Sequence, residues 1–141
     1  MTATRRCLPE WTRRAPLQLR LLAPEFAVCR LDQHAAIPGW ATAGPFYAIT
    51  RTGRELSIVC PAEQVPQEVH CQRGWRCLEV DGPLDFSLIG VLASLTAPLA
   101  QAGVSVFALS TYDTDYLMVQ ISNLDRAITA LAAAGHMVHP E

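Results

Sequence analysis

One pattern occurs twice in this chain, and it limits the folds that the chain can adopt. The segment FYAITRTGRELSIV (46–59) aligns without gaps on VFALSTYDTDYLMV (106–119), so that Phe46 falls on Val106 and Glu55 on Asp115. Each copy has the pattern of a strand, a polar turn with an acid near its end, and a second strand. The repeat predicts two related halves, each built around a β-hairpin. The alternative interpretation is a chance likeness between two unrelated hairpins.

The second half of the chain begins with a strand and a helix. WRCLEV (75–80) predicts the strand, and Asp81-Gly82-Pro83 then ends it. Apolar residues recur at helical spacing after this break, at Leu84, Leu88, Val91, Leu92, Leu95 and Leu99. They predict a helix over 84–101, with Pro98 bending or shortening its last turn and Gly103 as the left-handed residue after its end.

The rest of the second half predicts two strands, a helix and a closing strand. VSVFAL (104–109) has the composition of a buried strand, and residues 116–121 predict its partner across the turn at 110–115. Ser122 predicts the N-cap of a helix that Gly135 ends. Its expected buried stripe is Leu124, Ala127, Ile128, Leu131 and Ala134. With a short strand at 136–139, the order becomes β-α-β-β-α-β, which is that of a ferredoxin-like unit.

The first half repeats part of this order. AVCRL (27–31) resembles the strand WRCLEV, but the connection after it, DQHAAIPGWATAG, contains Pro38, Gly39 and Gly44 and has room for only a short helical turn. We therefore expect an α+β fold of two tandem ferredoxin-like units, the first one reduced. The expected boundaries are a mobile leader at 1–15, a first unit at 16–73 and a second unit at 74–141.

Composition and charge exclude several classes of function. The net charge is −2, and no arginine cluster coincides with aromatic residues, so we expect no nucleic-acid partner. All 11 basic residues are arginines, which rules out enzymes that need a P-loop or Schiff-base lysine. No apolar run approaches the length of about 18–20 residues that a membrane span requires. We expect a soluble, cytoplasmic protein that is not an enzyme.

The cysteines and histidines give no recognisable metal or catalytic pattern. The five cysteines are odd in number and contain no C-x-x-C, which favours reduced thiols, with Cys29 and Cys60 as small core residues. His136 and His139 lie three residues apart, but no third ligand accompanies them, and His70 beside Cys71 does not make a dyad. We therefore expect no metal, no cofactor and no catalytic residue.

The two copies of the hairpin resemble a known family. The run GPLDFSLIGVLASLTAPLAQAGVSVFALSTYDTDYLMV (82–119) resembles the ACT-domain proteins related to the CASTOR arginine sensors, and FYAITRTGRELSIVCPAEQVP (46–66) looks like the first ACT half of a bacterial group of these proteins. The resemblance covers about residues 17–139. It implies two tandem ACT units that bind a small ligand, of the amino-acid class, at an interface. Because the CASTOR sensors have four such units and this chain has two, we infer a homodimer.

The resemblance also implies a ligand site. The positions that match the CASTOR arginine site are Ser105 and Val106 on a strand, Thr111, Tyr112 and Asp115 at the turn, and Ile89, Gly90, Val91 and Leu92 on the helix. Asp115 is the matched acid, and it can accept hydrogen bonds from an ammonium or guanidinium group. Two further pocket positions are Asp85 and Leu88 here. Because Leu88 lacks a carboxylate that could hold a cationic side chain, a smaller or apolar amino acid is as plausible a ligand as arginine.

Two other hypotheses stay open. Asp and Thr side chains also stabilise turns by bonding to nearby backbone, so Asp115 could simply cap its own turn. In that case the chain would be a structural protein-interaction module, whose Ala-rich helices at 84–101 and 122–134 bury a partner helix instead of a ligand. An enzyme that uses a cysteine is the least favoured hypothesis, because no base accompanies the thiols.

Overall fold

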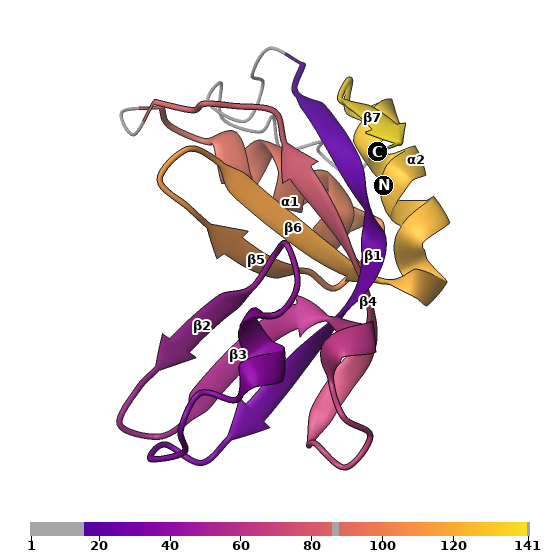
Figure 1. Ribbon diagram of the computed structural model, residues 1–141. Coiled ribbons are helices and arrows are strands. Elements are labelled where there is room, and N and C mark those ends of the chain that lie inside the picture. The colour runs from indigo at the N-terminus through magenta and orange to yellow at the C-terminus, as the bar shows by residue number, and fades with distance from the viewer. Residues whose placement is uncertain (1–15, 86–87, 141) are drawn as a thin grey trace, which may run out of the picture.

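The computed structural model describes residues 16–85 and 88–140 and shows a mixed α+β fold, as expected (Figure 1). Seven strands form one sheet in the order β2-β3-β1-β4-β6-β5, and β7 pairs with β1. The strands are β1 (Gln18–Leu31), β2 (Ala48–Arg51), β3 (Leu56–Pro61), β4 (Cys71–Val80), β5 (Phe107–Ser110), β6 (Asp115–Gln120) and β7 (Met137–Pro140). The α-helices are α1 (Val91–Gln101) and α2 (Leu124–Ala133), and the short 3-10 helices are η2 (Gly39–Thr42), η3 (Ala62–Gln64) and η4 (Ile121–Asn123).

The second half of the chain has the element order that the sequence predicts. It runs β4-α1-β5-β6-α2-β7, and both helices are followed by glycines in the left-handed region, at Gly103 (φ 74°) and Gly135 (φ 95°). Pro98 lies inside α1, which nevertheless continues beyond it to Gln101. In the first half, the short helix η2 lies between β1 and β2, where the sequence allows only a helical turn.

The predicted start of the first long helix is wrong. The helix begins at Val91 and not at Leu84, so Ile89 and Gly90 precede it. Gly90 has a φ of 79°, which no residue inside a right-handed helix can adopt. Before it, the Leu88 N–H donates to the Asp85 carbonyl at 3.0 Å, which makes a separate turn. The apolar residues of this turn have the same spacing as those of the helix, so the sequence pattern places the start of the helix too early.

Three smaller boundaries also differ from the sequence prediction. β5 begins at Phe107, so Ser105 and Val106 precede the strand on which the sequence places them. Ser122 lies within η4, and Asn123 occupies the N-cap of α2 without a side-chain cap bond. On α2, Ala127 and Leu131 are buried as predicted, whereas Ala134 is exposed and follows the helix. The 3-10 turn ahead of α2 moves the N-cap one residue later, and the preference for serine at N-caps does not predict such a shift.

The two hairpins are structurally equivalent, but in a register one residue away from the one that their sequences suggest. β2–β3 pairs Ala48 with Val59, and β5–β6 pairs Phe107 with Met118. The turns match in the same register, because Thr52 N–H donates to Glu55 O and Thr111 N–H donates to Thr114 O. The residue equivalent to Asp115 is therefore Leu56 and not Glu55. A one-residue shift in a strand moves every side chain to the opposite face, so this correction changes which residues are comparable.

Strand β1 joins the two halves. Its first residues pair with β7, from Gln18–Met137 to Leu21–Pro140, and its last residues pair with β3, from Phe26–Pro61 to Leu31–Leu56. Along its other edge β1 pairs with β4, with irregularities in register between Leu21 and Val28. The sheet is thus continuous from one hairpin to the other, and Figure 1 shows it curling so that the hairpins project from the same side of β1 and β4.

Three clusters of buried side chains hold the sheet. The helix core packs α1 and α2 on the sheet through Leu19, Leu78, Val80, Leu95, Leu99, Leu117, Val119, Ala127 and Leu131, with Val104 completing it. The first-half core contains Ala27, Cys29, Ala41, Leu56, Ile58, Cys60, Ala62 and Val65. A shared core contains Leu22, Phe26, Val59, Trp75, Cys77 and Met118, and it joins both hairpins. Among the described residues, no helix is long and apolar enough to cross a membrane.

Candidate ligand-binding site

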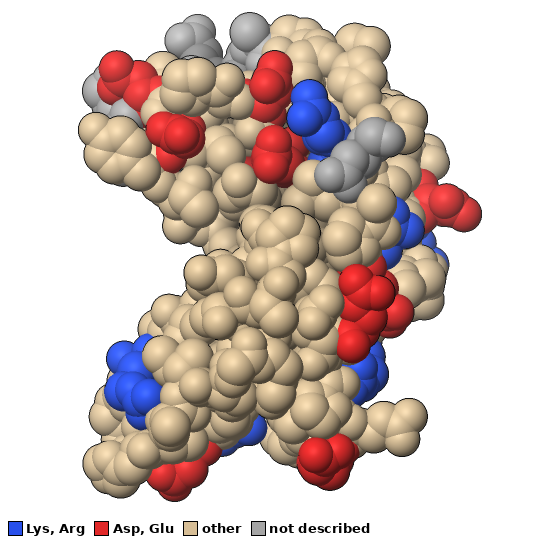
Figure 2. Space-filling view, viewed as in Figure 1, with Lys and Arg blue, Asp and Glu red and all other residues tan. Residues whose placement is uncertain are grey.

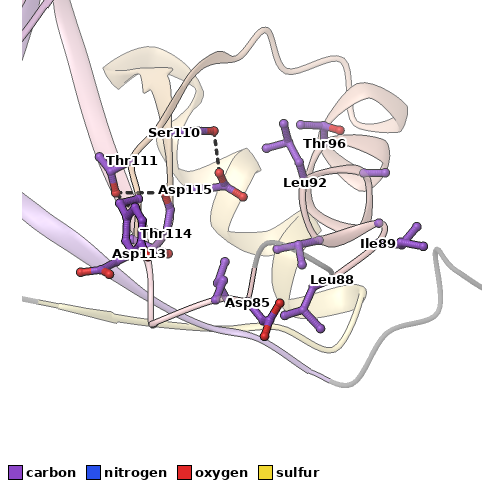
Figure 3. A pocket seen from close by; sticks show the side chains of 15 residues that line it. Asp85, Leu88, Ile89, Leu92, Thr96, Ser110, Thr111, Asp113, Thr114 and Asp115 are labelled. Atoms are coloured by element: carbon purple, nitrogen blue, oxygen red, sulfur yellow. Dashed lines mark hydrogen bonds between the residues drawn. The ribbon is translucent and has the colours of Figure 1, made fainter.

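A cavity of about 690 Å³ lies between the start of α1 and the turn of the second hairpin. Its volume is within the range of about 300–1,000 Å³ that small-molecule sites occupy. Figure 3 shows the hairpin residues on one side and the segment leading into α1 on the other. The lining residues are Leu84, Asp85, Leu88, Ile89, Gly90, Val91, Leu92, Ala93, Thr96, Ser110, Thr111, Tyr112, Asp113, Thr114 and Asp115.

Hydrogen bonds between β4 and the hairpin turn fix one wall of the cavity. Thr114 is buried, and its hydroxyl donates to the Val80 carbonyl at 2.6 Å. The Leu84 N–H donates to the Asp113 carbonyl, also at 2.6 Å. A side chain at Gly82 would lie 3.1 Å from that same carbonyl oxygen, so the absence of a Cβ allows this close approach. The turn is therefore held against the chain that leaves β4.

Asp115 provides a half-buried carboxylate at the first position of β6. The Ser110 hydroxyl donates to its Oδ1 at 2.6 Å, which fixes the side chain. In Figure 3 the carboxylate faces α1, on the side of Leu92 and Thr96, whereas Asp113 turns away from the cavity. At the equivalent position of the first hairpin, Leu56 is completely buried and belongs to the first-half core. The second half thus places an acid where the first half packs a leucine.

The first residues of α1 line the cavity. The Ser94 N–H donates to the Gly90 carbonyl at 2.9 Å as the first bond of the helix, so the N–H groups of residues 91–93 precede the hydrogen-bonded ladder. The N-cap residue Gly90 has no side chain to bond them. Such a helix end carries partial positive charge and suits a carboxylate.

The lining combines carboxylates, hydroxyls and apolar side chains. Asp85 and Asp115 contribute carboxylates, and among the described lining residues there is no arginine or histidine. Figure 2 shows several acidic side chains gathered on the upper part of the molecule, the part that holds the second hairpin. Leu88, Ile89 and Tyr112 are 42%, 74% and 80% exposed, so the mouth of the cavity is apolar. This arrangement can hold a ligand with an ammonium group and an apolar portion.

The structure gathers seven of the nine residues that the resemblance implies. Ile89, Gly90, Val91, Leu92, Thr111, Tyr112 and Asp115 all line the cavity. Ser105 and Val106 do not; they lie at the end of β5 away from the hairpin turn, and Val106 packs against the helix core. Sequence reasoning missed Thr96 and Ser110 as lining residues. Thr96 lies one helical turn after Leu92 along α1, a spacing that could have indicated it.

The described residues offer no cluster of three His, Cys, Asp or Glu side chains that could hold a metal ion, in the cavity or elsewhere. His136 is buried and fully engaged: its Nδ1 accepts from the Leu17 N–H at 3.1 Å, and its Nε2 lies 3.1 Å from the Ser94 carbonyl. It connects β1, α1 and the start of β7, and its role is structural.

Comparison with known proteins identifies the family. The family model of the ACT domain matches residues 70–133. A second family model, described as an N-terminal domain, matches residues 24–68. The cytosolic arginine sensor for mTORC1 subunit 1 of Rattus norvegicus is 29% identical over 99 residues, which cover 64% of this chain and 30% of the sensor. The chain is a CASTOR-like ACT-domain protein. It spans less than a third of the length of the arginine sensors that it matches.

Solved structures show the same fold. Protein Atu0741 from Agrobacterium tumefaciens is 38% identical with a TM-score of 0.86, and the match covers 91% of this chain and 96% of that protein. Protein VC0802 from Vibrio cholerae has a TM-score of 0.71 at 21% identity, covering 87% and 91%. The regulatory subunit of aspartate kinase from Thermus thermophilus has a TM-score of 0.59 at 11% identity, covering 85% and 99%. At these lower identities the last two likenesses concern the fold alone.

Proposed function

We propose that this chain is a non-catalytic regulatory module that binds an amino acid in the cavity between α1 and the second hairpin. One observation carries the proposal: a half-buried carboxylate, fixed by Ser110, faces the first residues of α1 across a largely apolar cavity. Asp115 would accept from the ligand's ammonium group, and the start of α1 would bind its carboxylate. Leu88, Ile89 and Leu92 would contact the ligand side chain.

The wider organisation is part of the same proposal. The hairpins match in one constant register along both strands and the turn, which supports two tandem ACT units, of which the first is reduced. The relatives include a cytosolic arginine sensor, which supports an amino acid as the ligand class and the cytoplasm as the location. The exposed Leu88, Ile89 and Tyr112 at the mouth of the cavity support a homodimer whose second copy covers the bound ligand. Binding would then act on a partner protein by changing the geometry of that dimer.

A thermal-shift screen with each of the twenty common amino acids tests the proposal. We expect at least one to raise the unfolding temperature in a saturable way, because a ligand that binds only the folded state stabilises it. Asp115→Ala should abolish that shift, whereas Asp113→Ala, which changes a carboxylate that points away from the cavity, should retain it. Absence of a shift with all twenty amino acids would refute the amino-acid ligand.

A second measurement separates the ligand-binding module from a purely structural one. The size of the assembly is measured by light scattering with and without the amino acid that gives the shift. We expect the size or the radius to change with ligand in the wild-type protein and to stay constant in Asp115→Ala. An assembly that ignores both the ligand and the substitution would favour a structural interaction module instead.

A further inference from the structure

Three of the cysteines lie side by side on neighbouring strands, far from the ligand cavity. Cys29 is on β1, Cys60 on β3 and Cys71 on β4, and all three are free thiols that belong to or pack against the first-half core. β1 lies between the other two strands, so Cys29 has a thiol on each side. The cysteines are far apart in the sequence, and the pairing of β1 with β3 and β4 brings them together.

Cys29 and Cys71 have the backbone geometry of a disulfide pair. They are direct partners in the antiparallel ladder between β1 and β4. The next hydrogen bond runs from Arg30 N–H to the His70 carbonyl at 3.1 Å, which makes Cys29 and Cys71 a non-hydrogen-bonded pair. In such pairs the Cα atoms are about 4.5 Å apart, within the range of about 4.4–6.8 Å that disulfides span.

Cys60 lies near Cys29 but outside the usual range for a disulfide with it. It pairs with Ala27, two residues before Cys29, so it lies diagonally across the β1–β3 ladder, where Cα atoms are about 7–8 Å apart and thus beyond the usual disulfide range. A hydrogen bond from Cys29 and the charge of Arg73 lower the pKa of the Cys60 thiol. The same hydrogen bond with Cys60, together with burial, raises the pKa of Cys29. Cys60 is therefore a hydrogen-bonding neighbour of Cys29.

Accessibility gives the three thiols different roles. Cys71 is partly exposed at the start of β4, whereas Cys29 and Cys60 are 1% and 0% exposed. An oxidant arriving from solvent meets Cys71 first. We propose that Cys71 and Cys29 form a reversible disulfide when a hydroperoxide oxidises Cys71.

The steps balance in atoms and electrons. The Cys71 sulfur attacks the peroxide oxygen, the O–O bond breaks, and a sulfenic acid forms with release of an alcohol, or of water from hydrogen peroxide. The Cys29 sulfur then attacks the Cys71 sulfur, and the S–O bond breaks. The departing hydroxide takes the proton that Cys29 loses and forms water. The two thiols have together lost two electrons, which reduced the peroxide, and a thiol reductant reverses the change.

The experiment uses the full chain carrying Cys7→Ser, because Cys7 lies outside the described residues and its thiol must not contribute. The reduced protein is treated with a small excess of hydrogen peroxide, alkylated, digested and analysed by mass spectrometry. We expect the mass of the intact protein, measured before alkylation, to fall by about 2 Da, the mass of the two hydrogen atoms lost on disulfide formation. The linked peptides should contain Cys29 and Cys71, and dithiothreitol should restore both thiols.

Two substitutions and one control test the roles of Cys71 and Cys29. Cys71→Ser should abolish the cross-link, while Cys77→Ser should retain it; Cys77 lies on the same strand in the shared core, where burial raises the pKa of its thiol to about 12. In Cys29→Ser, a sulfenic acid at Cys71 should accumulate and be trapped by dimedone. Cross-linking between another pair, or oxidation of Cys71 to the sulfinic acid without a cross-link in the Cys7→Ser protein, would overturn the proposal.

Discussion

The two hairpins share a backbone but differ at the residue that begins their second strand. Leu56 packs into the first-half core and is completely buried, while Asp115 at the equivalent position is bonded by Ser110 at the edge of a cavity. The helices around the two hairpins differ as well. The short helix η2 occupies the place of α1, and nothing in the described part of the first half corresponds to α2. The first hairpin thus packs against a closed core, and the second borders a cavity. The two regions differ both in this side chain and in the helix opposite it.

Placing the acid of the second half into the first should have the largest effect. Leu56→Asp puts a carboxylate among the apolar side chains of the first-half core, opposite Arg51 on β2. Because burial of a charge in such a core costs more than one cross-strand partner at the surface returns, we expect the free energy of unfolding to fall by about 3–5 kcal/mol. Chemical denaturation measures this loss, and Thr50→Asp on the exposed surface of β2 is the control, with a much smaller change. Equal losses in both variants would show that position 56 is not a core position.

The reverse exchange should close the cavity. Asp115→Leu gives the second hairpin the residue of the first, and it removes the carboxylate that would hold an ammonium group. We expect the affinity for the stabilising amino acid to fall by about 10- to 100-fold, as for the loss of a charge-assisted hydrogen bond. Calorimetry measures the affinity, and Asp113→Leu serves as the matched control. Unchanged affinity in Asp115→Leu would place the ligand elsewhere.

The bond that holds the second turn against β4 should have an intermediate effect. Thr114→Val keeps the shape of the side chain but removes the hydroxyl that donates to the Val80 carbonyl. Because this leaves a buried carbonyl without its partner, we expect a loss of about 1–2 kcal/mol in the free energy of unfolding. The matched control is Thr129→Val on the exposed face of α2, where the same change should alter stability little.

The acid of the first turn should have the smallest effect. Glu55 forms an ion pair with Arg30 at 2.9 Å, and both side chains are well exposed to solvent. We expect Glu55→Gln to reduce the free energy of unfolding by about 0.2–1 kcal/mol at low salt, and by less at high salt because counterions screen the pair. A loss as large as that of Thr114→Val would mean that the two turns are stabilised in the same way.

The sequence predicts the elements better than it predicts their alignment. The order of strands and helices in the second half follows from periodicity and from the glycines at 103 and 135. The sequence alignment places Glu55 on Asp115, whereas the strand ladders place Leu56 there. Residue types alone cannot distinguish these registers, since both turns are polar and both strands apolar. The packing does distinguish them, because only one register puts Leu56, Ile58 and Cys60 together in a core.

The candidate site could be predicted in part for a related reason. Thr111, Tyr112 and Asp115 are close in sequence, and one turn necessarily brings them together. The sequence puts Ile89 and Gly90 on a helix, because the apolar spacing around them gives no sign of the left-handed glycine that delays its start. Ser105 and Val106 belong to the correct segment but to its other end. Strand β5 separates Ser105 and Val106 from the cavity, and a residue-by-residue match does not show this distance.

The pairing of β1 with β7 has a consequence for how the protein is made. Gln18 pairs with Met137, and Leu17 N–H bonds to the ring of His136, so contacts of the helix core depend on residues from opposite ends of the described chain. Such distant pairing slows folding, because a long loop must close before the contacts stabilise it. During synthesis on a ribosome, β1 emerges early and its edge waits for a partner until the last strand has been translated. The interval exposes an unpaired edge to other unfinished chains, so a lower expression level, which reduces the concentration of such chains, should increase the yield of folded protein.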